Sequence, residues 1–207
     1  MASRVNVDYN SSPLHTMSKT NDKSLYIPVV LGTAREGRQS IKVARFVHAE
    51  FLKRAGIETE LIDVKDFIFP RTVPSWEDYE IAKRWREIAE HADGFIIIVP
   101  EYNRGYPGEL KQLLDSAYNE YEKKPVGLVG VSDGRFGGTA AISNITPTLV
   151  ELGLVVLRGA VRISNVDKQF NDKDEPVELE TYKKLVSKLF DSVISYALIL
   201  KSDRVKA

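Results

Sequence analysis

The hydrophobic positions of the chain fall into short continuous runs that alternate with amphipathic stretches. The runs predict five strands, at residues 26–31, 59–64, 94–99, 126–131 and 155–163. Continuous apolar runs are typical of strands that are buried on both faces of a sheet. Strands that alternate with helices therefore predict an α/β protein in which helices cover both faces of a parallel sheet.

The amphipathic stretches carry apolar residues at helical spacing. Their expected starts are Ser40, a capping box of Ser75 and Asp78, Pro107, and the region of Leu179. Another helix is expected before the fifth strand. In that helix, Pro147 either causes a kink or marks a start that Thr146 caps.

One domain is expected, with a tail at each end. Residues 1–24 are rich in Ser, Asn, Asp and Lys and show neither strand nor helix periodicity, which predicts a mobile N-terminal tail. We expect the domain to span residues 25–200 and a short C-terminal tail to span residues 201–207.

Composition excludes several classes of function. Lys and Arg together number 29, as do Asp and Glu, so the formal net charge is zero. The overall charge therefore does not favour binding to nucleic acid. The absence of cysteine excludes disulfides, a cysteine nucleophile and thiolate metal sites. No metal site is expected. No apolar run is long enough to span a bilayer, and the N-terminus lacks the apolar core of a secretory signal, so we expect a cytoplasmic protein.

Ligands of open doubly wound sheets bind beyond the carboxyl ends of the strands, which makes the loops there the candidates. After the first strand, residues 32–40 read Gly-Thr-Ala-Arg-Glu-Gly-Arg-Gln-Ser and lead into a helix. Helix N-termini and arginine side chains both bind phosphate. The alternative is a polar loop in which Ser40 only caps the helix. The loop lacks the Gly-Lys-Ser/Thr ending of a P-loop, which argues against nucleoside triphosphates. It also lacks the spaced glycines of a dinucleotide-binding fingerprint.

The loops after the third and fourth strands offer groups for a flat ring. Residues 100–108 read Pro-Glu-Tyr-Asn-Arg-Gly-Tyr-Pro-Gly, with two tyrosine rings and the amide of Asn103. Residues 132–138 read Ser-Asp-Gly-Arg-Phe-Gly-Gly, and glycines let the backbone approach a ligand closely. Simple turns with packed tyrosines are the alternative. Together the three loops predict a site for a phosphorylated flat heterocycle, and flavin mononucleotide (FMN) is the candidate.

The chain resembles the NAD(P)H-dependent FMN reductase family, a flavodoxin-like group that also includes quinone, azo-dye and chromate reductases. The resemblance rests on Gly-Thr-x-Arg-x-Gly-Arg-x-Ser at 32–40, Pro-Glu-Tyr-Asn at 100–103, Tyr-Pro-Gly-x-Leu-Lys at 106–111, Lys-Pro-Val at 124–126 and Ser-x-Gly-x-x-Gly-Gly at 132–138. It implies a flavodoxin-like three-layer sandwich around a five-stranded parallel sheet of order 2-1-3-4-5. It also implies non-covalent FMN, with NADPH or NADH as co-substrate.

The resemblance assigns cofactor-binding residues in each loop. For the FMN phosphate they are Thr33, Arg35, Arg38 and Ser40, with Ile41 beside them; for the ribityl chain and ring edge, Pro100, Glu101, Tyr102 and Asn103; for the pyrimidine end, Ser132, Asp133, Gly134, Gly137 and Gly138. The flavin carries a ping-pong transfer from nicotinamide to a small-molecule acceptor such as a flavin, quinone, azo dye or metal oxyanion. No catalytic side chain is therefore expected. Homodimers or homotetramers are implied, with the helix after the second loop at an interface.

Two other functions stay open on the sequence alone. A non-enzymatic flavodoxin-like electron carrier is disfavoured by the zero net charge, because such carriers are usually strongly acidic. A binding module that keeps the fold without the flavin is disfavoured by the two arginines of the first loop and by Asn103.

Overall fold

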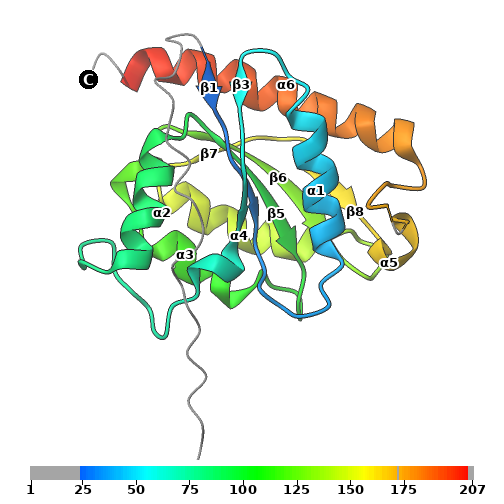
Figure 1. Ribbon diagram of the computed structural model, residues 1–207, viewed down its shortest axis with the longest axis horizontal. Coiled ribbons are helices and arrows are strands. Elements are labelled where there is room, and N and C mark those ends of the chain that lie inside the picture. Colours follow the sequence, from blue (N-terminus) through cyan, green and yellow to red (C-terminus); the bar gives the residue numbers. More distant parts are fainter. Residues whose placement is uncertain (1–23, 172, 205–207) are drawn as a thin grey trace, which may run out of the picture.

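Eight short strands and six α-helices alternate along residues 24–171 and 173–204, the part of the chain that the computed structural model describes (Figure 1). The strands are β1 (Leu25–Tyr26), β2 (Val29–Leu31), β3 (Ile57–Glu58), β4 (Leu61–Asp63), β5 (Phe95–Pro100), β6 (Pro125–Val131), β7 (Val155–Val156) and β8 (Val161–Ile163). The helices are α1 (Ser40–Phe51), α2 (Glu80–His91), α3 (Gly108–Asp115), α4 (Thr139–Glu151), α5 (Val166–Gln169) and α6 (Leu179–Arg204). Two 3₁₀ turns, η1 (Val64–Phe67) and η2 (Asn119–Tyr121), complete the set. The expected N-terminal tail lies outside the described residues, apart from Ser24.

The central sheet is parallel and has six strands. Its order is β4-β2-β5-β6-β7, with β8 also paired to β6, while β1 and β3 form a separate parallel pair. Five strands were expected. The count differs because the first and the fifth predicted strands are each divided into two pieces, and because β3 precedes the second predicted strand. The α/β class and the flavodoxin-like architecture are as predicted.

Local backbone chemistry explains the divided strands. Pro28 separates β1 from β2 and has no N–H to donate, but Ile27 N–H still bonds Glu58 O and Val29 N–H bonds Glu60 O, both at 2.9 Å. The two pieces therefore keep one register against β3 and β4. In the predicted fifth strand, the chain leaves the sheet between β7 and β8, where Gly159 has a φ of +83°.

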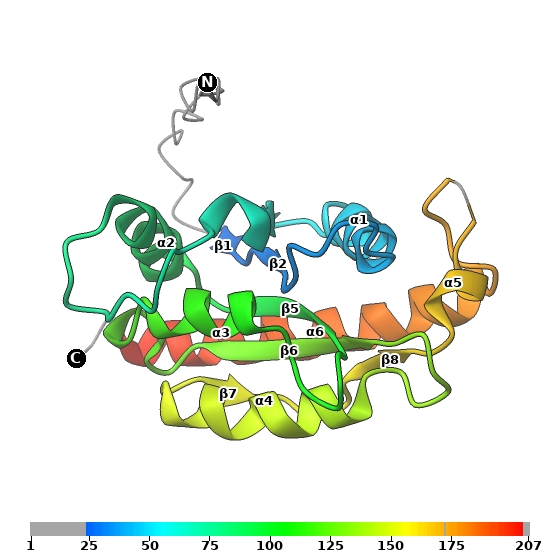
Figure 2. The same cartoon turned by 90° about the horizontal axis from the view of Figure 1, so that it is seen from below.

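Alternate residues of each strand pack against opposite helix layers. In β5, Ile96 and Ile98 join the core beneath α1 and α6, whereas Ile97 and Val99 join the core beneath α2, α3 and α4. Figures 1 and 2 show these helices on the two sides of the sheet. Burial on both faces is the physical reason that the strand sequences are apolar throughout.

The start of α2 differs from the prediction. The expected capping box of Ser75 and Asp78 is wrong, because the helix begins at Glu80 and its N-cap makes no side-chain hydrogen bond. Ser75 O instead accepts from Arg86 at 2.9 Å, and Asp78 pairs with Lys83 at 2.7 Å. Residues 75–79 therefore form a loop rather than a helical turn.

Helix α4 passes through Pro147 without a break. It runs continuously over Thr139–Glu151, so the alternative in which Pro147 marks a helix start is wrong. Thr146 does not cap a new helix, because its hydroxyl donates to Ile142 O at 2.7 Å within the same helix. Packing of the buried α4 face, which includes Ile145 and Leu149, outweighs the one backbone bond that proline removes.

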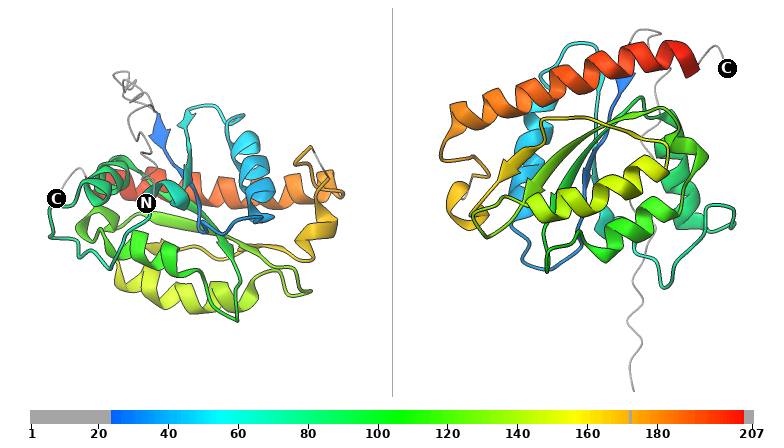
Figure 3. Two further views of the ribbon diagram at one scale, coloured as in Figure 1. Left: turned by 60° about the horizontal axis from the view of Figure 1, so that its bottom comes forward. Right: turned by 180° about the vertical axis from the view of Figure 1, so that it is seen from behind.

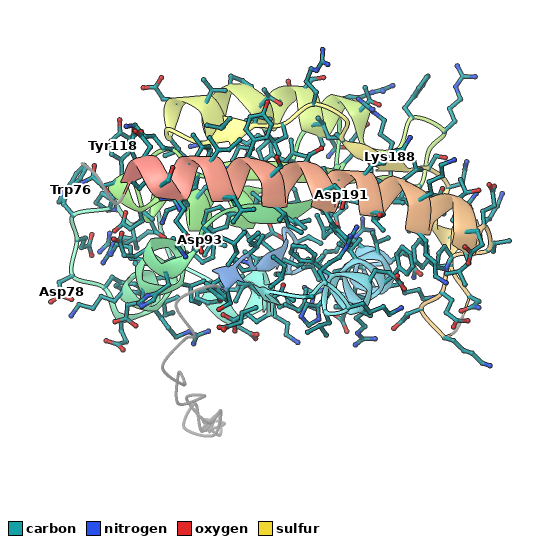
Figure 4. The ribbon with its side chains drawn as sticks, turned by 90° about the horizontal axis from the view of Figure 1, so that it is seen from above. Trp76, Asp78, Asp93, Tyr118, Lys188 and Asp191 are labelled. Atoms are coloured by element: carbon teal, nitrogen blue, oxygen red, sulfur yellow. The ribbon has the colours of Figure 1, made fainter. Side chains whose placement is uncertain are left out.

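The predicted C-terminal tail begins too early. Helix α6 continues to Arg204, so residues 201–204 are helical, and residues 205–207 lie outside the described part of the chain. Lys201 and Arg204 bind the two carboxylate oxygens of Asp93 at 2.9 and 3.0 Å, and Asp93 is only 6% exposed. The views from behind and from above show α6 crossing the molecule to reach this point (Figures 3 and 4).

In residues 24–171 and 173–204, no helix combines the length and the apolar character that crossing a bilayer requires.

Candidate functional site

Three loops leave the central sheet at one edge. Strands β2, β5 and β6 are neighbours and parallel, so their carboxyl ends lie together, at the lower edge in Figure 1. Hydrogen bonds continue into the loops: Gly32 N–H donates to Ile98 O at 3.0 Å, and Glu101 N–H donates to Val131 O at 2.8 Å. The structure thereby brings the predicted site residues of all three loops to the same end of the sheet.

The first loop, residues 32–39, presents unpaired donors at the N-terminal end of α1. Among the described residues, the backbone N–H groups of residues 36–41 make no hydrogen bond of good geometry. Ser40 is 3% exposed, and its Oγ has no hydrogen-bond partner among the described residues. The alternative in which Ser40 only caps the helix is therefore wrong. A buried hydroxyl without a partner is costly, and the positive end of the helix dipole lies beside it, so these groups suit an anion such as phosphate.

The two arginines of this loop have different surroundings. Arg38 donates to Thr33 O and to the carboxylate of Asp63, which ends β4, and the paired side chains are only 10% and 11% exposed. Arg35 is exposed, with its guanidinium 5.2 Å from the ring centre of Tyr102. Among the described residues, the Arg35 guanidinium donates no hydrogen bond. Arg38 thus fixes the shape of the loop, whereas Arg35 has free N–H groups for a ligand.

Thr33 connects the first loop to the second loop and to α3. Its side chain is fully buried, and its Oγ1 lies 3.1 Å from Tyr102 Oη and 3.2 Å from Glu109 Oε1. The same oxygen accepts from Arg35 N–H at 3.2 Å. The Thr33 hydroxyl is therefore used within the protein, which differs from the phosphate-binding role that the sequence suggested for it.

The second loop, residues 101–107, contains a tight turn. Tyr102 and Gly105 exchange two backbone hydrogen bonds of 2.9 Å, and Asn103 and Arg104 between them have φ angles of +50° and +68°. Positive φ at both central positions is the type I′ arrangement. The turn exposes the side chain of Asn103, whereas Pro100 before it is buried as the last residue of β5.

Helix α4 holds the second loop in place. Three side-chain contacts do this: Glu101 Oε2 with Ala140 N–H at 3.0 Å, Asn144 Nδ2 with Arg104 O at 2.6 Å, and Tyr106 Oη with Thr148 Oγ1 at 3.0 Å. The carboxylate of Glu101 therefore faces the N-terminal end of α4. Asn144 and Thr148 were not predicted from the sequence, because their partners lie about 40 residues away in the chain.

The third loop, residues 132–138, packs tightly against β6 and β8. Gly137 and Gly138 have φ angles of +57° and +76°, and a Cβ on Gly138 would lie 2.6 Å from the Val131 nitrogen. A Cβ on Gly137 would lie 2.8 Å from Arg162 Cβ. These two glycines are required by packing within the protein, whereas the sequence suggested close approach to a ligand. Gly134, in contrast, has open space around it.

The third loop also presents unpaired donors. The backbone N–H groups of residues 134–138 make no hydrogen bond of good geometry within the described part of the chain. Asp133 is exposed beside them, and Ser132 Oγ donates to Gly134 O at 2.9 Å. A run of N–H groups of this kind can bind carbonyl oxygens or a developing negative charge.

Two sets of free donors therefore lie at one end of the sheet. The set at α1 suits a phosphate, and the set at residues 134–138 suits the polar edge of a ring. Ile41 lies in the first turn of α1 and is partly buried against the core. Within residues 24–171 and 173–204, no group of three His, Asp or Glu side chains is placed to hold a metal ion.

Comparison with known proteins identifies the family. The family model described as NADPH-dependent FMN reductase matches residues 25–168. An NAD(P)H-dependent FMN reductase from a Nectria species is 30% identical over 135 residues, which cover 59% of this chain and 66% of the relative, slightly less than two thirds of its length. A quinone reductase from Pseudomonas putida is 28% identical over 163 residues, which cover 72% of this chain and 87% of the relative.

Solved structures support the same fold. The flavoenzyme FerB, an NAD(P)H:(acceptor) oxidoreductase from Paracoccus denitrificans, superimposes with a TM-score of 0.69 at 23% identity, over 84% of this chain and 97% of that one. The match of the family model covers more than half of the chain and contains all three loops. The chain therefore belongs to the NADPH-dependent FMN reductase family, whose members are oxidoreductases that use FMN with NAD(P)H as co-substrate.

Proposed function

We propose that this chain is an NAD(P)H-dependent reductase that binds FMN at the three loops and passes electrons to a small-molecule acceptor. The observation that carries the proposal is the Ser40 hydroxyl, which is 3% exposed and has no partner in residues 24–171 and 173–204, at the N-terminal end of α1, where no side chain caps the helix. A folded protein rarely buries such a donor without a ligand or water to satisfy it. Family membership supports FMN as that ligand.

The FMN phosphate would be held at α1. Ser40 Oγ, the free N–H groups of residues 36–41 and the guanidinium of Arg35 are the groups that remain available there. Arg38 and Thr33 support the loop indirectly, because their polar atoms already bond to Asp63, Tyr102 and Glu109. This division refines the expected phosphate-binding set.

The isoalloxazine ring would lie between the second and third loops. Asn103 is exposed there and has both an amide donor and an acceptor. The free N–H groups of residues 134–138 would bind the pyrimidine end and stabilise negative charge near it. Glu101 would stabilise this arrangement indirectly, because its carboxylate accepts a hydrogen bond from Ala140 N–H and so connects the second loop to α4.

Bound FMN would supply hydride transfer from NADPH or NADH and electron transfer to a small-molecule acceptor, in a ping-pong cycle. The three loops would hold the flavin, and the N–H groups of residues 134–138 would supply fixed dipoles at its ring edge. No acid or base side chain is required for this function. The relatives that are named quinone reductase and NADPH azoreductase support quinones and azo dyes as acceptors to test first.

The visible spectrum of the purified protein tests the proposal. Flavin absorption that is present or appears on addition of FMN, and that bleaches with NADPH under anaerobic conditions, supports a flavin-dependent reductase. Steady-state oxidation of NADPH with a quinone then separates the enzyme from an electron carrier. A colourless protein that leaves the FMN spectrum unchanged would contradict the proposal.

We also propose that the chain forms homodimers or homotetramers. Trp76 and Tyr118 are 86% and 51% exposed, and both lie at the end of the molecule where α6 finishes (Figure 4). Arg86 holds their two segments together, because it donates to Ser75 O and Ser116 O at 2.9 Å each. Exposed aromatic side chains are favoured in subunit interfaces. Light scattering that gives the mass of a single chain would contradict this proposal.

A cytoplasmic location is proposed as well. The absence of cysteine is compatible with a reducing compartment, and nicotinamide nucleotides are supplied there. Cell fractionation with an antibody against the protein tests it.

A further inference from the structure

One carboxylate lies within the loop that is proposed to bind phosphate. Glu109, in the first turn of α3, accepts a hydrogen bond from Ala34 N–H at 2.9 Å and from Thr33 Oγ1 at 3.2 Å. Both donors belong to the first residues of the loop after β2. We propose that Glu109 competes with the FMN phosphate for this loop and so keeps FMN exchangeable rather than permanently bound. The inference rests on the proposed function of the same site.

Glu109 occupies two hydrogen-bond donors at the start of this loop. Thr33 is fully buried, and its hydroxyl hydrogen can be donated to only one acceptor at a time. While that acceptor is Glu109 Oε1, the hydroxyl is not available to a phosphate oxygen. The N–H of Ala34 is used in the same way. The Glu109 carboxylate also satisfies these two donors, and it thereby stabilises the conformation of the loop when no flavin is bound.

The charge around the loop adds to the competition. Arg38 is neutralised by Asp63 in a pair whose side chains are 10% and 11% exposed. Glu36 is an exposed residue of this loop, and Glu109 on α3 contacts the loop at the N–H of Ala34. Arg35 is therefore the cation in this loop that no carboxylate pairs in the described structure. A phosphate with up to two negative charges would bind next to a fixed carboxylate, which opposes binding by simple Coulomb repulsion.

A charge-only substitution isolates this effect. Glu109→Gln keeps an oxygen that can accept from Ala34 N–H and Thr33 Oγ1 but removes the negative charge. We expect its Kd for FMN, measured by quenching of flavin fluorescence, to fall by about tenfold, which corresponds to about 1.4 kcal/mol. The Kd for riboflavin, which has the same ring and no phosphate, should stay within about twofold, since the repulsion acts on the phosphate.

Glu36→Gln is the matched control. It removes the same charge from the same loop, but no hydrogen bond joins Glu36 to the other described residues. Its effect on the FMN Kd should be smaller than that of Glu109→Gln, because an exposed charge is screened by solvent. Glu109→Ala, which frees both donors, should also tighten FMN binding relative to riboflavin. Urea unfolding without flavin verifies that each variant folds.

Three results would overturn the inference. An FMN Kd of Glu109→Gln that is unchanged or higher would show that the residue only supports the loop. An equal gain for FMN and riboflavin would show that the phosphate is not involved, and an equal gain in Glu36→Gln would show a general charge effect. If the unmodified protein binds neither FMN nor riboflavin, the proposed function itself fails, which is a different outcome from any of these.

Discussion

The division of labour between Arg35 and Arg38 gives the sharpest prediction. In Arg35→Ala, an exposed side chain that makes only a contact with the Tyr102 ring is lost, so the free energy of unfolding should change by no more than about 1 kcal/mol. The loss of a charge-assisted hydrogen bond to phosphate should cost about 1.5–3 kcal/mol of FMN binding, which raises the Kd about ten- to 150-fold. Riboflavin binding should change little.

Arg38→Ala should show the opposite pattern. The substitution leaves Asp63 with Lys65 at 3.7 Å as its remaining cationic contact, in a position where the carboxylate side chain is 11% exposed. Breaking a largely buried pair in this way costs about 3 kcal/mol of stability. For a chain of this size that lowers Tm by about 6–12 °C. Urea unfolding and thermal melts without flavin measure this loss.

Fluorescence titration with FMN and riboflavin, run beside the unfolding experiments, completes the comparison. Arg135→Ala is a suitable control, because Arg135 is an exposed arginine in the third loop that contacts its neighbour Phe136. An unchanged FMN Kd in Arg35→Ala would refute the assignment of the phosphate to α1. Equal stability of Arg38→Ala and the unmodified protein would refute the structural role of the Arg38–Asp63 pair.

Three further predictions concern single groups. Ser40→Ala removes a hydroxyl that has no partner in the described structure, so it should leave the flavin-free stability within about 0.5 kcal/mol and raise the FMN Kd about fivefold, as measured by the same titration. Gly138→Ala, with φ at +76° and a Cβ 2.6 Å from the Val131 nitrogen, should lose at least about 2 kcal/mol in urea unfolding, whereas Gly134→Ala, which has open space, should lose almost nothing. Burial lowers the pKa of Lys124 to about 8, with the nearby Arg204 charge as a second cause. The unfolded chain therefore binds more protons than the native protein above pH 8, and stability should rise between about pH 8 and 10.5 by up to about 3 kcal/mol. Lys124→Met should remove this rise, and equal pH slopes for the two proteins would contradict the lowered pKa.

The pattern of apolar residues predicts the fold class because burial on both faces leaves a direct trace in the sequence. The run at 94–99 corresponds to β5 and the run at 126–131 to β6, each within one residue at either end. The divided strands were not predicted. Their interruptions depend on Pro28 and Gly159, and whether the chain continues in the sheet past such residues is decided by its neighbours.

The helix starts show the same limit. Ser75 and Asp78 have the spacing of a capping box, but Arg86 binds the carbonyl of Ser75 and keeps this segment as a loop. The expected domain ends at residue 200, whereas α6 continues to Arg204. Asp93, which is more than a hundred residues away in the chain, extends the helix through its pairs with Lys201 and Arg204.

The sequence by itself determined the architecture, the family and the three loops that carry the candidate site. Apolar periodicity and short motifs are local properties, and they can be read without knowing which segments meet. The tertiary structure alone decided the role of each polar side chain. The structure pairs Arg38 with Asp63 and joins Thr33 to Tyr102 and Glu109 by hydrogen bonds. It leaves the Ser40 hydroxyl and N–H groups of two loops without partners among the residues that it describes. Hydrogen bonds and ion pairs act over a few ångströms between segments that are distant in the chain, so only the folded molecule shows which donors are used and which are free for a ligand.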